Sequence, residues 1–401
     1  MTTTTTPNEL PRGIPEAVGM SGEGLAQISN VVQGFIDAGK IQGAVVGVSR
    51  RGKVVYFKAQ GVSDLDTGAP MQEDNLFHMA SSTKPVLGVA AMMMIEEGLF
   101  KPIDAVQTYI PEFRDIKVAV LKDPADKDIS PEFVLKDNIP AHRLVDVHRP
   151  VTIRDLLTHT SGLASFGLGE AVSTWKWPPD EADTLASWIP KVAAGPLDFQ
   201  PGSRWMYSGT VGLDVVARII EIVSGTPFNA LVQERIFDPL DMKDTHWNIP
   251  EDKIPRLVVI RGDKGNWRKP TRYFSGSIGL ISSPRDYLHF EQMLLNGGTL
   301  FGNRLLSPGS VALMSSNQVG DLYREKGDTK GVGFGYTVSI TLDPDRAKST
   351  RSAGAFGWGG AAGTMSWTEP KEALTAVIMV QQPTIDLPND VSQAIREAIV
   401  D

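Results

Sequence analysis

The chain has 401 residues, of which 41% are apolar and 21% are charged, and its formal net charge is −8. This composition is typical of a globular protein with one large domain, or with two domains that share an active-site cleft. A negative chain without a Lys/Arg-rich run does not fit a nucleic-acid-binding protein, and the lack of cysteine excludes disulfides, thiolate metal sites and a cysteine nucleophile.

The first residues form a low-complexity segment. The run from Thr2 to Thr6 has neither a basic start nor an apolar core, so we expect residues 1–18 to be a flexible tail and not a signal peptide. The longest apolar stretch, from Val86 to Ile95, is about half as long as a bilayer crossing requires. We therefore expect a soluble, cytoplasmic protein with no membrane partner.

The next segments predict a helix and a hairpin. Apolar residues recur at helical spacing from Leu25 to Ile36, which predicts an amphipathic helix over residues 21–38. Valine-rich stretches at residues 42–49 and 54–60 follow, and they flank the turn sequence Arg-Arg-Gly-Lys at residues 50–53. This pattern is typical of two antiparallel strands.

Residues 105–265 are rich in loops, and we expect helices there at about 152–158 and 209–224. Beyond them the sequence predicts a helix near 284–296, strands at 335–342, 363–367 and 373–381, and a last helix at 390–400.

These strands cannot bury their apolar faces separately, so we expect one antiparallel sheet with the terminal helices over one face. The predicted fold class is α/β of the α+β type. We expect a sheet domain made of residues 19–104 and 266–401, a mostly helical domain made of residues 105–265, and an active site in the cleft between them.

A serine and a lysine stand at i and i+3 where a long apolar helix begins. Ser81 and Lys84 would share one face of its first turn, and the apolar residues up to Gly98 predict that the helix is buried. Burial favours the neutral amine, which can take the proton of the Ser81 hydroxyl and make it a nucleophile. The same spacing recurs at Ser173 and Lys176, among tryptophans and prolines, so the pattern alone is weak evidence.

A second proton-transfer group and oxyanion donors are needed for acyl chemistry at a serine. Tyr207 follows a Pro-Gly turn and precedes an apolar helix, where a neighbouring ammonium would favour its phenolate; the alternative is a packed, hydrogen-bonded tyrosine. The glycine-rich residues 354–363 let a ligand approach backbone N–H groups, and an edge strand beginning there would supply an oxyanion donor beside the N–H of Ser81. The alternative is a glycine-rich loop around a packed tryptophan.

Other chemistries lack their sequence patterns. The six histidines show no metal-ligand spacing, and the chain has neither a Gly-x-Gly-x-x-Gly nor a Walker loop, so we expect no metal and no cofactor. Gly-x-Ser-x-Gly is also absent, which makes an α/β-hydrolase a poor fit.

With these stretches in hand, the chain resembles the serine β-lactamase and penicillin-binding-protein superfamily, in its class C-like branch. Within that branch it is most similar to family VIII carboxylesterases and simvastatin-synthase-like acyltransferases. The stretches that carry the resemblance are residues 77–84, Tyr207-Ser208-Gly209 and Trp358-Gly359-Gly360.

The resemblance implies that Ser81 is the nucleophile, that Lys84 and Tyr207 are the proton-transfer pair, and that the N–H groups of Ser81 and Ala361 form the oxyanion hole. It also implies that Trp358, Gly359 and Gly360 bind substrate. His159 falls in a stretch that resembles the family's framework, so we interpret it as a structural residue.

Two departures from the family pattern bear on the substrate. Trp358 stands where β-lactamases place a lysine that engages the substrate carboxylate, and Gly209 replaces an asparagine that donates to a substrate amide. These changes favour a serine carboxylesterase that acts on neutral short-chain or small aromatic esters through an acyl-serine. The alternatives are an acyltransferase of the same fold, a β-lactamase, D-aminopeptidase or small-amide hydrolase, and a non-enzymatic binding module with a decayed site. We predict a small ester as the partner and make no prediction of oligomeric state.

Overall fold

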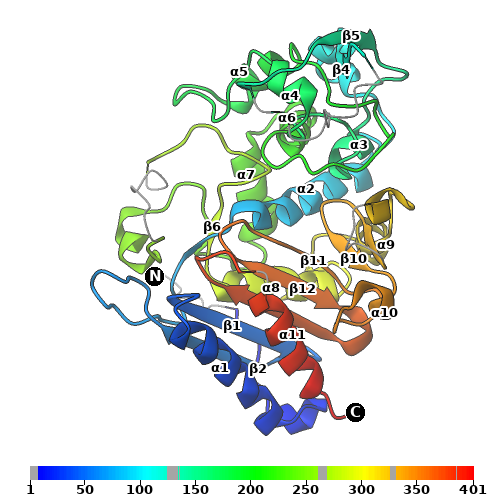
Figure 1. Cartoon of the computed structure of the whole chain (residues 1–401). Coiled ribbons are helices and arrows are strands. Elements are labelled where there is room, and N and C mark those ends of the chain that lie inside the picture. The colour runs from blue at the N-terminus through cyan, green and yellow to red at the C-terminus, as the bar shows by residue number, and fades with distance from the viewer. Residues whose placement is uncertain (1–7, 124–133, 135, 261–268, 326–330, 385) are drawn as a thin grey trace, which may run out of the picture.

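A seven-stranded sheet forms the base of the molecule (Figure 1). The computed structural model describes residues 8–123, 134, 136–260, 269–325, 331–384 and 386–401. The strand order is β2-β1-β13-β12-β11-β10-β9, and each neighbouring pair is antiparallel, as the sequence predicts. The strands are β1 Gly43–Arg50, β2 Lys53–Gly61, β9 Val332–Phe334, β10 Ser339–Thr341, β11 Phe356–Gly359, β12 Met365–Glu369 and β13 Leu374–Met379.

Helices cover both faces of this sheet, so its central strands are buried on both sides. The helices α1 (Gly22–Asp37) and α11 (Asp386–Glu397) lie side by side over one face, and α8 (Pro284–Leu295) packs on the other (Figure 1). Alternate residues of β1 serve the two layers: Val46 packs with α1 and α11, whereas Val45 belongs to the core that contains α8. The expectation that the terminal helices share one face is confirmed.

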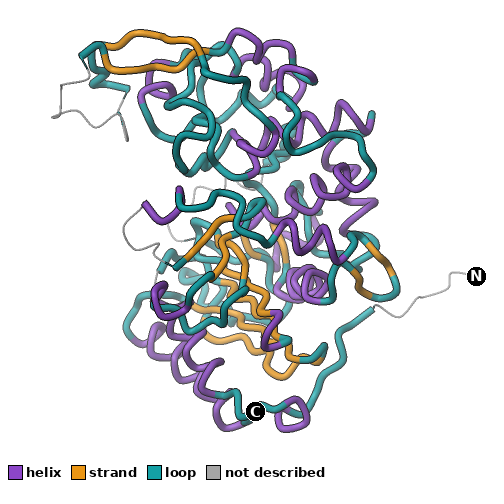
Figure 2. Tube along the Cα trace, turned by 90° about the vertical axis from the view of Figure 1, so that its right-hand side faces the viewer, coloured by secondary structure: helices purple, strands orange, loops and turns teal. Residues whose placement is uncertain are grey.

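The other part of the molecule lies above α2 and consists of short helices and a hairpin (Figures 1 and 2). Helix α2 (Lys84–Glu96) packs against α6 and also contacts β11, so it joins this part to the sheet. The elements between residues 105 and 265 are α3 Ile153–Leu157, α4 Leu168–Val172, α5 Leu185–Val192, α6 Gly212–Ser224, α7 Phe228–Val232, the π-helical turn Gln233–Phe237 and the strands β4 Lys117–Leu121 and β5 His142–Asp146. The domain boundaries at 104/105 and 265/266 stay a prediction.

The smaller elements complete the chain. They are α9 Pro308–Met314, α10 Pro344–Ala347, the short strands β3 Phe77–His78, β6 Ile281–Ser282, β7 Thr299–Leu300 and β8 Asn303–Arg304, and the 3₁₀ turns Pro15–Val18, Ala80–Thr83, Val106–Thr108, Pro111–Asp115, Glu251–Arg256, Leu322–Glu325 and Pro370–Glu372. No single described helix is long and apolar enough to cross a membrane; α6 and Phe228–Phe237 reach that length and composition only as a pair, and they are bent by 81°.

The prediction of a flexible tail over residues 1–18 is wrong for residues 8–18. The backbone there pairs with β2, since the Val54 N–H donates to Pro11 O at 2.9 Å and the Gly13 N–H donates to Val54 O at 2.9 Å. Val18 is 2% exposed and lies in the core beneath α1. Residues 1–7 lie outside the described part of the chain.

Two predictions about late strands also need correction. Residues 335–342 are not one strand: residues 335–338 form the turn between β9 and β10, where Thr337 has φ 68° and the Gly335 N–H donates to Val338 O, and only 339–341 are in β10. The strand at the glycine-rich segment, β11, is not at the sheet edge, because it lies between β12 and β10. However, β10 pairs only with Phe356 and Gly357, so Trp358 and Gly359 extend beyond it.

A buried carboxylate, Glu291 of α8, ties this helix to the sheet. Its two oxygens accept hydrogen bonds from Ser366 Oγ at 2.6 Å and from Thr368 Oγ1 at 2.7 Å, and both donors are on β12. The side chain is 1% exposed. Burial raises the pKa of Glu291 to about 7, against the opposing effect of the two hydroxyl donors and of Arg351.

This shift makes stability depend on pH in a definite direction. Because the folded pKa lies above that of an unfolded glutamate, the stabilisation is fully present below about pH 4, and it is lost as the pH rises to about 7. The wild type should lose this stabilisation between pH 5 and pH 8, whereas Glu291→Gln has no carboxyl group to titrate. Relative to the wild type, the unfolding free energy of Glu291→Gln should therefore gain about 2 kcal/mol when the pH is raised from 5 to 8. Urea unfolding at the two pH values measures the gain. The exposed Glu112→Gln is the control, and an equal gain in both variants would contradict the assignment.

Candidate active site

Ser81 lies in a strained turn that leads directly into α2. It belongs to the 3₁₀ turn Ala80–Thr83, in which residues at i and i+3 stand one above the other, so Lys84 follows on the same face. The preceding residue, Ala80, has φ 44°, which is unfavourable for a side chain larger than glycine's. Such strain concentrates at functional sites, where the surrounding structure holds it in place.

Lys84 is fully buried and its amine contacts three oxygen atoms. Lys84 Nζ lies 3.2 Å from Ser81 Oγ, 2.7 Å from Gly209 O and 2.9 Å from Ser277 O. The two carbonyls can only accept, and they take two N–H bonds of a neutral amine. The lone pair of that amine then faces the Ser81 hydroxyl, which can donate to it.

The electrostatics of the site favour this neutral form. Desolvation lowers the pKa of Lys84, and the charges of Tyr207 and Asp214, together with the hydroxyl of Tyr207, oppose that lowering. The sequence signal for Lys84 was its place in an apolar helix. Its carbonyl partners could not be found in this way, since any residue type supplies a carbonyl.

Tyr207 and Trp358 lie beside this pair. The Tyr207 ring is centred 5.0 Å from Lys84 Nζ, and the indole N–H of Trp358 donates to the Tyr207 hydroxyl oxygen at 3.3 Å. The two rings are 5.4 Å apart and belong to an aromatic cluster that also contains Trp205, Tyr323 and Phe334. The structure thus brings together Ser81, Lys84, Tyr207 and Trp358 from three separate stretches of the chain.

His159 supports Tyr207 and lies away from the Ser81 hydroxyl's contacts. Its ring is centred 4.8 Å from the Tyr207 ring, and its Nδ1 accepts a hydrogen bond from the Ser208 N–H at 3.3 Å. The side chain is 1% exposed, and burial, followed by the charge of Lys84, holds its pKa well below the usual range. A neutral histidine that is used as an acceptor toward the backbone fits the structural role inferred from the sequence.

The end of β11 approaches the Ser81 turn closely. A Cβ built on Gly360 would overlap the Met79 carbonyl oxygen and the Thr364 hydroxyl, so only glycine fits there without a shift. The Thr364 hydroxyl lies 3.2 Å from Met79 O and 3.0 Å from Ser82 Oγ, which fastens the β11–β12 turn to the residues on either side of Ser81.

Two backbone N–H groups are available at this junction. Ser81 lies in the first turn of its helical segment, where N–H groups have no intrahelical partner. Ala361 is exposed, and its N–H makes no hydrogen bond within the described residues.

The second Ser-x-x-Lys stretch has no comparable geometry. Helix α4 ends at Val172, and Ser173 is extended, with φ −67° and ψ 143°. Its hydroxyl donates to Gly169 O at 2.7 Å, while Lys176 is exposed. The motif alone therefore did not distinguish the two stretches, but the apolar helix behind Ser81 did.

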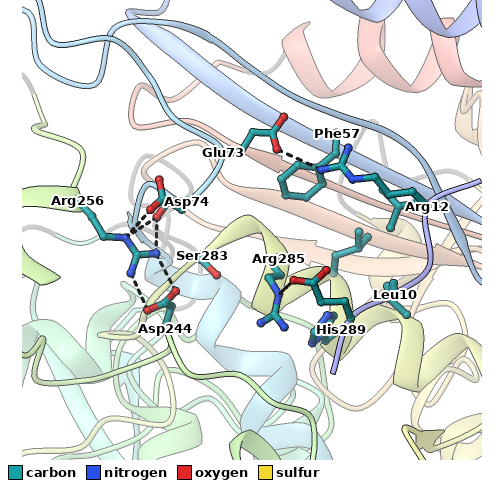
Figure 3. A pocket seen from close by; sticks show the side chains of 13 residues that line it. Leu10, Arg12, Phe57, Glu73, Asp74, Asp244, Arg256, Ser283, Arg285 and His289 are labelled. Carbon is teal, nitrogen blue, oxygen red and sulfur yellow. Dashed lines mark hydrogen bonds and ion pairs between the residues drawn. The ribbon is translucent and has the colours of Figure 1, made fainter. Parts of the chain in front are cut away.

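A separate cavity of about 260 Å³ lies between the N-terminal segment, β2 and α8 (Figure 3). Its arginines face carboxylates: Arg12 lies 3.3 Å from Glu73, and Arg256 lies 3.1 Å from Asp74 and 2.7 Å from Asp244. The lining contains none of the residues around Ser81. These arginines are therefore paired with carboxylates within the protein, and the cavity lies apart from Ser81.

The chain matches a protein-family model described as Beta-lactamase over residues 28–398. It belongs to the β-lactamase family. This family has the β-lactamase fold of serine hydrolases and esterases. The proteins similar to this chain include esterases, and its structural neighbours include proteins described with acyltransferase or synthase activity.

Similar proteins in this family include two esterases. Esterase EstB of Burkholderia gladioli is 28% identical over 400 residues, covering 90% of this chain and 91% of EstB. Lovastatin esterase of Penicillium rubens is 33% identical over 310 residues, covering 72% of each chain. Among solved structures, EstCE1, described as a hydrolase with promiscuous acyltransferase activity, has a TM-score of 0.77 at 24% identity and covers 94% of this chain and 99% of its own. The last match shows the fold.

The close approach at Gly360 generates a prediction. In Gly360→Ala the new methyl group must push the β11–β12 turn away from Met79, so we expect covalent labelling of Ser81 by a fluorophosphonate to slow by about 10- to 100-fold. The rate of labelling of the folded variant measures this.

Gly34→Ala, in α1, is the matched control, because a Cβ there meets nothing within 4 Å. Labelling of Gly360→Ala at the wild-type rate would show that this approach does not serve Ser81.

Proposed function

We propose that the protein is a serine carboxylesterase that acts on neutral short-chain or small aromatic esters through an acyl-serine intermediate. The observation that carries the proposal is the Lys84 amine, buried and held 3.2 Å from Ser81 Oγ by two backbone carbonyls. This amine has its lone pair directed at a hydroxyl, and in the β-lactamase family that arrangement supports nucleophilic attack by serine.

Acylation begins with transfer of the Ser81 proton to the Lys84 amine as Ser81 Oγ attacks the ester carbonyl carbon. The carbonyl π electrons move to oxygen, and the N–H groups of Ser81 and Ala361 donate to the resulting oxyanion. When the carbonyl re-forms, the bond to the alkoxide breaks, and the alkoxide takes the Tyr207 hydroxyl proton. The Lys84 ammonium then returns a proton to Tyr207, which leaves both groups as they began.

Deacylation repeats these steps with water. As the water attacks the acyl carbon, Tyr207 accepts a proton from it and passes its own proton to the neutral Lys84 amine. The tetrahedral intermediate then releases the Ser81 oxygen, which takes the proton back from the Lys84 ammonium. Trp358 assists by donating its indole N–H to the Tyr207 oxygen at 3.3 Å, which fixes the direction of the phenol.

The nature of the substrate is inferred from Trp358 and Gly209. The indole offers an apolar surface and one neutral donor, already engaged by Tyr207, at the position of the lysine of β-lactamases. Gly209 offers its carbonyl to Lys84 and has no side chain to bind an amide. An uncharged ester needs neither group, and for that reason we place esters before β-lactams and peptides.

An acyltransferase is the second candidate. The similarity to EstCE1, whose description includes acyltransferase activity, favours it. Both reactions share the acyl-serine and differ in whether water or an alcohol attacks it. Partitioning of the products of p-nitrophenyl butyrate between free acid and a new ester, with methanol added, distinguishes them.

The esterase proposal is tested by labelling and turnover. We expect a fluorophosphonate to label Ser81 in the wild type, and p-nitrophenyl acetate turnover to fall to background in Ser81→Ala and by about 10²- to 10⁴-fold in Tyr207→Phe, because general acid-base catalysis is lost. Ser173→Ala is the control for the second Ser-x-x-Lys stretch and should keep the wild-type rate.

Two results would contradict the proposal. Failure of the probe to label folded wild-type protein would favour a binding module, and nitrocefin turnover comparable to that of p-nitrophenyl esters would favour a β-lactamase.

A further inference from the structure

Helix α6 carries a buried carboxylate that the proposed reaction does not use. Asp214 is 0% exposed and lies in the first turn of this helix, among buried apolar residues. It accepts hydrogen bonds from the Tyr273 hydroxyl at 2.8 Å, the Ser275 hydroxyl at 2.8 Å and the Ser277 N–H at 2.9 Å. All three donors come from one short segment, residues 273–277, so the carboxylate holds that segment as a unit.

The same segment provides an acceptor for Lys84. The Ser277 N–H donates to Asp214, and the Ser277 carbonyl accepts from Lys84 Nζ at 2.9 Å. One residue therefore connects the carboxylate to the amine through its own backbone.

The fit of this segment is tight. A Cβ built on Gly276 would lie 2.5 Å from Leu87 Cδ1 of α2 and 3.2 Å from Ala217 Cβ of α6, so the backbone fills the space between the two helices. Helices α2 and α6 restrict movement of the segment on both sides. The hydrogen bonds to Asp214 then fix the direction of the Ser277 carbonyl.

We propose that Asp214 is a positioning residue, which aims the Lys84 amine at Ser81 through the Ser277 carbonyl and supplies a buried negative charge to it. The inference rests on the proposed function of Ser81 and Lys84. Asp214 does not touch the reacting atoms in this arrangement; it acts on the group that does.

The charge has a chemical use because desolvation alone weakens Lys84 as a base. Burial is the largest cause that lowers the Lys84 pKa, and Asp214 and Tyr207 are the charged groups that raise it again. A base must keep enough proton affinity to take the hydroxyl proton, and a buried counter-charge provides this. His159 is also close enough to interact with the amine: burial, and then the charge of Lys84, lowers the pKa of His159.

The pKa of Asp214 lies close to neutral pH. Burial raises its pKa to about 6, against the hydrogen bonds from Ser275, Tyr273 and Ser277. The pKa of Tyr273 is raised well above its usual value by burial and then by Asp214, with the charges of Asp183 and Glu221 adding to it. Asp214 is therefore ionised above about pH 6, and its charge is then present while the Lys84 amine acts as a base toward Ser81.

The experiment compares two isosteric variants of buried aspartates. Asp286 of α8 is a matched control, since it is also 0% exposed, has its pKa raised to about 6, and accepts from the Asp244 N–H and the Thr245 hydroxyl. It makes no contact with Lys84. The readout is the pH dependence of kcat/KM for p-nitrophenyl acetate, which reports acylation of Ser81, with folding checked by circular dichroism.

We expect Asp214→Asn to move the acidic limb of this profile down by about one pH unit, because the amine loses its counter-charge. The plateau rate should fall by about 10- to 100-fold, because the amine is less well aimed. Asp286→Asn should leave the limb in place and the rate within about twofold. Tyr273→Phe, which keeps the carboxylate and removes one donor, should show a smaller shift in the same direction, and it serves if Asp214→Asn does not fold.

Several outcomes would overturn the inference. An unmoved limb in Asp214→Asn and Tyr273→Phe, or an equal shift in Asp286→Asn, would show that Asp214 only stabilises the fold. Failure of a fluorophosphonate to label Ser81 in the folded wild type would instead refute the esterase proposal, so the two failures are distinguishable.

Discussion

The site depends on one constraint, which is that an amine buried without water must find all its hydrogen-bond partners in the protein. Lys84 meets this with the Gly209 and Ser277 carbonyls and the Ser81 hydroxyl. Each partner comes from a different stretch of the chain, so the amine fixes how α2, the start of α6 and the 273–277 segment lie relative to one another. The packing around Lys84 and the proposed chemistry depend on the same three contacts.

The sheet contributes through the end of β11, and its role is geometric. Gly360 lets one backbone pass close to another, and Thr364 fastens that approach to Met79 and Ser82. Trp358, beyond the reach of β10, brings its indole to Tyr207. Trp358 thus stands on a strand of the sheet and Lys84 on a buried helix, so regular structure positions both side chains.

Much of this could be predicted from the sequence because it depends on periodicity and on side-chain chemistry. The first helix and the hairpin of β1 and β2 have strong local signals, and the apolar helix behind Ser81 and Lys84 strengthened a motif that is weak alone. The turn between β9 and β10 has no such local signal, since a short apolar stretch with one glycine is also typical of a strand. The order of residues 8–18 depends on pairing with β2, and such non-local contacts are invisible to a local pattern. The carbonyl partners of Lys84 are equally invisible. Asp214, which stands among apolar residues in the first turn of α6, was a usable signal for a buried carboxylate.

The pairing of β1 with β13 has a consequence for how the protein is made. These strands come from near the two ends of the chain and are neighbours, with Val45 opposite Met379, and α1 packs on α11 in the same way. A ribosome delivers Ser81 and Lys84 long before β11, β12 and β13. The nascent chain therefore exposes a hydrophobic hairpin and helix α2 without the strands that cover them, and closure of the sheet requires contacts of very long sequence separation. The surroundings of Ser81 can therefore be completed only once β11, β12 and β13 have been synthesised, and this arrangement favours late assembly of the site.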